Sequence, residues 1–263
     1  MIRPRRWAGI ARSASAIAAS SALAGALISG CGGAGGKPSL LVSAAASLQK
    51  PFTRYGEHFT AASVRLSFAG SDMLAAQIEQ GLHPDVFASA NTSLPETLHA
   101  RGLVEKPVAF AANTLVLAVP AGAHRVNSLS DLERPGVTLA IGTATVPVGS
   151  YTHTLLGRLP AAQRNAILAN VHDSEPDVSG IIGKLSEGAV DAGFLYATDV
   201  AATQGALRTI ELPPQLQPQV DYGVAVVKGS KHLTQARAFI AGLLTGAGRR
   251  ALLESGFSEP RSG

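Results

Sequence analysis

Apolar residues in this chain occur in short unbroken runs, and most of these runs lead into stretches with helical spacing. The stretch 40–49, LLVSAAASLQ, begins as an apolar run of the kind found in buried strands and then becomes amphipathic. We interpret it as a strand that passes into a helix with Ser47 as its N-cap, so that the hydroxyl and the first free amides face one point. A capping serine at a plain strand-to-helix turn explains the same pattern, and the stretch alone leaves both interpretations open.

The same succession of strand and helix recurs along the chain. Further strands are predicted at 64–68, 85–90, 114–119, 137–141, around 171, 191–196 and 222–227. Further helices are predicted at 73–80, 94–101, 129–134, 150–158, 178–187, 197–204, 231–244 and 246–255. Strands that alternate with helices indicate an α/β protein with mostly parallel sheets. We expect the chain to cross between two domains near 111–113 and again in the proline-rich segment 212–219.

Four of the predicted helices begin just beyond Ser47, Ser71, Val148 and Val178. The first amides of a helix have no acceptor within the helix and carry partial positive charge, which favours an anion. No arginine or lysine lies within these turns. The pattern predicts a site for a small, fully deprotonated oxyanion that is held by neutral donors.

The N-terminus has the features of an export signal. Four arginines precede an alanine-rich apolar segment at 13–28, and small residues then lead to Cys31, the only cysteine. This arrangement resembles the lipobox of bacterial lipoprotein signal peptides, in which the cysteine after the cleavage site is acylated. We expect a signal peptide at 1–30, and a lipidated Cys31 with a glycine tether at 31–36. About 16 apolar residues is short for a transmembrane helix, which is the alternative.

Removal of the first 30 residues changes the charge balance. They contain four of the 22 basic residues and no acidic ones, so 18 basic residues would remain against 18 acidic ones. A near-neutral mature protein does not have the charge of a nucleic-acid-binding protein, so we expect no nucleic-acid partner. With a single cysteine, the exported part has no disulfide and no thiolate metal site.

Enzyme motifs are absent from the sequence. It contains no GxSxG, no GxxxxGK[ST] and no HExxH, and its seven histidines are isolated from one another. His153, which follows a predicted anion-binding turn, is the one histidine that we retain as a candidate. An exported lyase or hydrolase with His153, Asp72 or Asp177 as its acid or base remains the alternative from a different class.

Six motifs in fixed order are similar to those of one known family. They are AAASL at 44–48, FAGSDMLAAQIEQG at 68–81, HPDVFASA at 83–90, TVPVGSY at 145–151, PDV at 176–178 and GFLYATDVA at 193–201. Together they resemble the substrate-binding protein of the bacterial molybdate ABC transporter, a type II periplasmic binding protein, and the resemblance extends from about residue 40 to 257. It implies two α/β lobes with the ligand in the cleft between them. We expect 37–113 plus 224–263 to form lobe 1, and 114–223 to form lobe 2.

The resemblance also implies a ligand and the residues that bind it. The ligand would be molybdate or tungstate, with no cofactor, and molybdenum would be bound only as its oxyanion. Hydroxyls and amides of Ser47 and Ser71, backbone amides of Val148 and Val178, and the phenol of Tyr196 would bind it. On the residues alone, a tyrosine at a strand end would be expected only to pack with its hydroxyl in water.

Three positions depart from the family pattern. Val148 stands where alanine is usual, Asp72 where a small neutral residue is common, and Ser179 where arginine is frequent. An Asp72 carboxylate that pointed into the cleft would repel a dianion, and Ser179 supplies no positive charge.

The sequence therefore predicts a monomeric, lipid-anchored receptor on the outer face of the cell membrane. It would bind its oxyanion there and deliver it to an ABC transporter permease. A receptor for sulfate or another small oxyanion, and a sensor that presents the bound form to another protein, share the same site and remain alternatives.

Overall fold

The computed structural model describes residues 37–261. The predicted signal peptide, Cys31 and the glycine tether therefore lie outside the described residues. Among the residues described, no helix is both long enough and apolar enough to span a bilayer.

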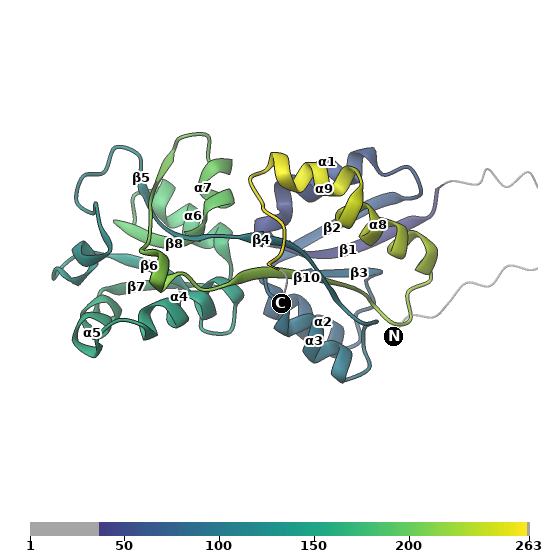
Figure 1. The fold of residues 1–263 in the computed structure, drawn as a ribbon, viewed down its shortest axis with the longest axis horizontal. Coiled ribbons are helices and arrows are strands. Elements are labelled where there is room, and N and C mark those ends of the chain that lie inside the picture. The colour runs from purple at the N-terminus through teal and green to yellow at the C-terminus, as the bar shows by residue number, and fades with distance from the viewer. Residues whose placement is uncertain (1–36, 262–263) are drawn as a thin grey trace, which may run out of the picture. The chain divides into compact units, whose positions relative to one another are not determined.

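Two five-stranded sheets form the framework of the domain (Figure 1). The first has the order β2-β1-β3-β10-β4 and the second the order β7-β6-β8-β5-β9. In the first sheet the strands are β1 (Ser39–Ala45), β2 (Ser63–Ala69), β3 (Val86–Ser89), β4 (Val108–Asn113) and β10 (Val220–Val226). In the second they are β5 (Leu115–Pro120), β6 (Leu139–Gly142), β7 (Val171–Glu175), β8 (Ala192–Tyr196) and β9 (Leu207–Ile210).

The two sheets have the same pattern of strand direction. In each sheet three neighbouring strands are parallel, and the fourth strand in the order, β10 or β5, is antiparallel to both of its neighbours. Four of five strands in each sheet thus share one direction, as expected for the α/β architecture. The carboxyl ends of parallel strands in such sheets are the usual place for a ligand site.

Helices cover the sheets. The α-helices are α1 (Gln49–His58), α2 (Ser71–Glu79), α3 (Ser93–Ala100), α4 (Pro147–Gly157), α5 (Ala161–Ala169), α6 (Val178–Ser186), α7 (Ala197–Ala202), α8 (Leu233–Thr245) and α9 (Ala247–Glu254). Short 3-10 helices occur at η1 (Ala46–Leu48), η2 (Leu129–Glu133) and η3 (Pro214–Leu216).

The chain passes from the first sheet to the second at Thr114 and returns after η3. β10 begins at Val220, and Tyr222 pairs with Ala111 of β4. Residues 220–223, which the sequence analysis placed with the second lobe, therefore belong to the first sheet.

Several predicted elements differ from those observed. Strands β4 and β9 and helix α5 were not predicted, and α4 begins at Pro147 rather than at Ser150. The predicted N-cap role of Ser47 is wrong, because Ser47 lies inside the 3-10 turn η1 and makes no capping bond. The tight turn η1 separates β1 from α1, and its geometry frees the serine hydroxyl for a tertiary contact.

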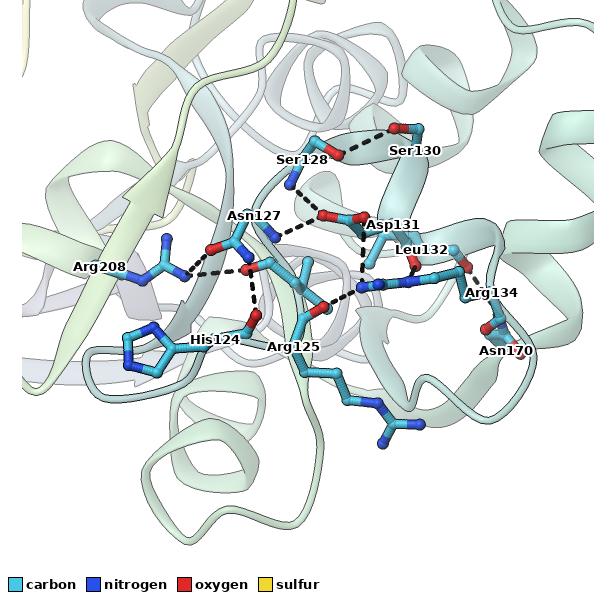
Figure 2. Close-up of polar contacts among 11 residues, drawn as sticks. His124, Arg125, Asn127, Ser128, Ser130, Asp131, Leu132, Arg134, Asn170 and Arg208 are labelled. Atoms are coloured by element: carbon cyan, nitrogen blue, oxygen red, sulfur yellow. Dashed lines mark hydrogen bonds and ion pairs between the residues drawn. The ribbon is translucent and has the colours of Figure 1, made fainter.

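A polar cluster fixes the long connection between β5 and β6 (Figure 2). One guanidinium nitrogen of Arg208 donates to the backbone oxygens of Ala123 and Val126 and to Oδ1 of Asn127. The carboxylate of Asp131 accepts from the amides of Asn127 and Ser128. These contacts tie the connection to Arg208 of β9, and none of these residues lines the cavity at the candidate site.

Candidate functional site

A small cavity lies where turns from both sheets meet. It is lined by Ala45, Ala46, Ser47, Ala69, Gly70, Ser71, Ala90, Val146, Pro147, Val148, Asp177, Val178 and Tyr196. These residues end or follow β1, β2, β3, β6, β7 and β8, so the cavity lies at the carboxyl ends of the parallel strands. All five residues predicted to bind the ligand line this one cavity.

Each serine hydroxyl of the cavity has a partner in the protein. The amide of Ala90 donates to Oγ of Ser71 at 3.1 Å, which leaves the proton of Ser71 available to a ligand. Oγ of Ser47 lies 3.0 Å from the phenolic oxygen of Tyr222. The small side chains of Ala45, Ala46 and Ala69 leave the backbone close to the space between the two serines.

The helix starts at the cavity retain free amides. In α6 the carboxylate of Asp177 accepts from the amides of Ser179 and Gly180, at 2.8 and 3.3 Å. This cap leaves the first amide of the helix, that of Val178, without an acceptor inside the helix. In α4 the first position is Pro147, which has no N–H, and Val148 supplies the first free amide.

Tyr196 carries the one buried side-chain polar atom without a hydrogen-bond partner among residues 37–261, its phenolic oxygen. The residue is 1% exposed and lines the cavity. Burial, with the nearby Tyr222, Tyr151 and Asp199, raises the pKa of this phenol well above its ordinary value. The phenol is therefore neutral at physiological pH and retains a proton to donate. A buried donor without an acceptor costs about 1 to 3 kcal/mol, so its persistence needs an explanation.

The cavity contains little formal charge. No lysine, arginine or histidine lines it, and its one carboxylate, Asp177, is engaged by the two amides of α6. Residues 37–261 contain no group of three or more histidine, cysteine, aspartate or glutamate side chains that could hold a metal ion. The arrangement can bind an anion through hydroxyl and amide donors.

The two acidic or polar departures from the family pattern lie outside the cavity lining. Asp72 does not line it, and its Oδ2 accepts a 2.7 Å hydrogen bond from the hydroxyl of Thr145. Asp72 therefore links the start of α2 to the turn before α4 rather than facing the ligand space. Ser179 lines a larger neighbouring pocket, to which Lys50 and Arg54 of α1 also contribute.

The third candidate acid or base, His153, also lies away from the cavity. It is exposed on α4 and does not line the cavity. Of the three residues considered for acid–base chemistry, only Asp177 reaches the cavity, and there it caps a helix.

Sequence reasoning missed two residues next to the site, Tyr222 and Asn113. Both are buried, and Nδ2 of Asn113 lies 3.4 Å from the phenolic oxygen of Tyr222. Their partners are distant in sequence, so no local pattern identifies them. The capping role of Asp177 could have been predicted from the sequence, because an aspartate directly before a predicted helix is a common N-cap.

Known proteins resemble this chain over nearly all of the described residues. Residues 40–258 match the family described as bacterial extracellular solute-binding protein. The molybdate-binding protein ModA of Mycobacterium tuberculosis is 36% identical over 86% of this chain and 86% of its own length. A putative ABC transporter substrate-binding lipoprotein of Bacillus subtilis, YvgL, is 28% identical over 84% of this chain and 87% of its own length.

A solved structure shows the same fold. The periplasmic molybdate-binding protein of Azotobacter vinelandii superposes with a TM-score of 0.76, covering 84% of this chain and 100% of that protein, at 20% identity. The predicted α/β periplasmic-binding-protein fold is confirmed, as is the resemblance recognised from the six motifs. The chain therefore belongs to the bacterial extracellular solute-binding proteins, in the family that includes the molybdate-binding ModA proteins.

Proposed function

We propose that this protein captures molybdate, and also tungstate, outside the cell membrane and delivers it to the permease of an ABC importer. The observation that carries the proposal is the phenolic hydroxyl of Tyr196, a buried neutral donor with no acceptor among the described residues. It lines a cavity that Ser47 and Ser71 share with the starts of α4 and α6. The name of the 36% identical relative supports molybdate as the ligand.

Molybdate suits this set of groups for a chemical reason. At neutral pH it is a fully deprotonated tetrahedral dianion, which only accepts hydrogen bonds. Neutral hydroxyls and amides satisfy such an ion without any group that must accept a proton. A hydrogen bond to a charged acceptor contributes about 1.5 to 3 kcal/mol, so the donors of these five residues can offset much of the cost of removing water from the ion.

Each donor has a distinct role in the proposed complex. The hydroxyls and amides of Ser47 and Ser71 bind from the first sheet. The backbone amides of Val148 and Val178 and the phenol of Tyr196 bind from the second. The protein acts as a carrier, so that no bond of the ligand is made or broken, and neither a cofactor nor a resident metal takes part.

The anion specificity can be tested by thermal unfolding of the purified protein with a panel of molybdate, tungstate, sulfate, phosphate and chromate. A ligand that binds only the folded state raises the melting temperature with its concentration. We expect molybdate and tungstate to raise it at concentrations where sulfate and phosphate do not. If only sulfate or phosphate raised the melting temperature, molybdate would be the wrong ligand.

We also propose that Cys31 is acylated and anchors a monomeric protein to the outer face of the membrane. The basis is the sequence around Cys31, and a relative named as a lipoprotein supports it. In a native host, detergent phase partitioning should place the wild type in the detergent phase and Cys31→Ser in the aqueous phase. Equal partitioning of both proteins into the aqueous phase would contradict the anchor.

A further inference from the structure

Four buried polar side chains form a hydrogen-bonded network that reaches the cavity from the point where the chain passes between the sheets. They are Asn113, Thr198, Tyr222 and Ser47. Nδ2 of Asn113, at the end of β4, lies 2.8 Å from Oγ1 of Thr198 and 3.4 Å from the phenolic oxygen of Tyr222. The phenolic oxygen of Tyr222 lies 3.0 Å from Oγ of Ser47. The network therefore ends on a hydroxyl that lines the candidate site.

The orientation of the Asn113 amide is set by the backbone. The amide N–H of Thr114 donates to Oδ1 of Asn113 at 2.9 Å, which identifies that atom as the oxygen. The other atom of the side-chain amide is then the nitrogen, which can only donate. It donates to Thr198 and, over a longer distance, to Tyr222, so the phenolic oxygen of Tyr222 acts as an acceptor at this contact.

The single proton of Tyr222 must then find another acceptor. The residue is fully buried, and its pKa is raised well above the ordinary value, mainly by that burial, so the phenol keeps its proton. The other hydrogen-bond partner of its oxygen is Oγ of Ser47. When Tyr222 donates to Ser47, the hydroxyl proton of Ser47 is free to point into the cavity.

We propose that Tyr222 is a positioning residue that sets Ser47 as a hydrogen-bond donor to the bound oxyanion. This inference rests on the proposed function. In the reverse arrangement Ser47 would donate to Tyr222 and present lone pairs to the cavity, which would repel an anion. The backbone N–H of Ala90 donates to Oγ of Ser71 in the same way. The hydroxyl protons of both serines are then free to be donated into the site.

The direction of the hydrogen bond between Tyr222 and Ser47 affects which oxyanions the site can bind. A serine whose oxygen already accepts from Tyr222 is poorly placed to accept a proton from the ligand as well. The site therefore favours oxyanions without protons over hydrogen phosphate. Loss of Tyr222's hydroxyl frees Ser47 to accept, and should narrow the difference in affinity between molybdate and phosphate.

A double-mutant cycle tests the proposal with Tyr222→Phe, Ser47→Ala and the double variant, each titrated with molybdate by calorimetry. We expect Tyr222→Phe to raise Kd about 5- to 30-fold, the equivalent of one or two kcal/mol. In the Ser47→Ala background the same change should alter Kd by less than about twofold, because the hydroxyl that it orients is gone. Tyr55→Phe is the control, since it also removes a buried phenol, one that donates to the backbone oxygen of Phe239, and should leave Kd unchanged.

The outcomes separate this inference from the proposed function. If the wild type binds molybdate but Tyr222→Phe has no effect, or the same effect with and without Ser47, the positioning role is overturned. If the wild type binds none of the oxyanions, the proposed function fails and the positioning role fails with it. Should Tyr222→Phe not fold, Asn113→Ala replaces it in the cycle and is expected to weaken binding only when Ser47 is present.

Discussion

Polar side chains at the candidate site also make structural contacts within the protein. Oγ of Ser71 accepts from the amide of Ala90, and the carboxylate of Asp177 caps α6. Tyr196 differs from both, because its hydroxyl has no partner within residues 37–261. A protein that retains a buried, unpaired phenol loses stability there, so the group is best explained by a ligand.

Replacement of Tyr196 by phenylalanine separates binding from folding. Tyr196→Phe should weaken molybdate binding by about 1 to 3 kcal/mol, because one donor to a charged acceptor is lost. The ligand-free protein should be as stable as the wild type or more stable, since the variant removes an unpaired buried hydroxyl. Calorimetry and thermal unfolding measure the two effects, and a less stable variant with unchanged affinity would show that the phenol is structural.

Asp199 makes stability depend on pH. Burial is the main cause that raises its pKa from 3.8 to about 7, with a smaller contribution from Asp177, although the amide of Tyr196 donates to its Oδ2. Between about pH 4 and 7 the folded protein therefore keeps a proton that the unfolded chain has lost. Unfolding releases this proton, so the contribution of Asp199 to stability falls as pH rises through this window and is constant above it.

The variant Asp199→Asn should remove this dependence. Its free energy of unfolding, relative to the wild type, should rise between about pH 4 and 7 by at most about 1.4 kcal/mol per pH unit. Urea unfolding of both proteins at several pH values measures the difference. A constant difference across the window would mean that Asp199 ionises with an ordinary pKa.

The start of α4 packs closely against the turn after β6, and this packing positions an amide donor of the second sheet. A Cβ at Gly149 in α4 would meet the backbone oxygens of Thr143 and Gly142, so only glycine allows the helix to start this close to β6. That approach positions the amide of Val148 next to the cavity.

Substitution of Gly149 should therefore disturb both stability and binding. Gly149→Ala forces a backbone shift at the start of α4, and we expect it to cost about 1 to 3 kcal/mol or more of stability and to weaken molybdate binding. Gly157→Ala, at the far end of the same helix, meets nothing within 4 Å and should be neutral or stabilising by up to about 1 kcal/mol. Thermal unfolding and calorimetry of the two variants test this, and equal behaviour would refute the close-packing role.

The sequence predicts elements well where a pattern is local. Glycines 81, 102 and 188 end predicted helices and have positive φ in the structure, and the apolar run 40–45 is a buried strand. Helix α5 and strands β4 and β9 were missed, since their patterns are mixed and tertiary pairing determines them. The family motifs identified Ser47, Tyr196 and the other candidate residues. The contact between Ser47 and Tyr222 spans 175 positions and has no local signature in the sequence.

At the scale of the whole domain, the two sheets meet around the cavity through close polar contacts. Thr145 donates to Asp72 across the two halves, and a Cβ at Gly70 would meet the backbone oxygen of Pro176. The described arrangement is thus one in which the starts of α2 and α6 approach each other closely.

Gly70→Ala should interfere with this approach. The added methyl group would keep the starts of α2 and α6 apart, so the donors of the two sheets could not contact one ion together. We expect a loss of molybdate affinity of at least about tenfold, or roughly 1.4 kcal/mol. Affinity equal to that of the wild type would show that binding does not require this contact.

Five residues from the two sheets should together bind one molybdate ion through neutral hydrogen-bond donors. Calorimetric titration of the purified protein with molybdate measures this binding. We expect one site per chain with a Kd between nanomolar and micromolar, about −12 to −8 kcal/mol. No binding of molybdate or tungstate, together with saturable binding of sulfate or phosphate, would contradict it.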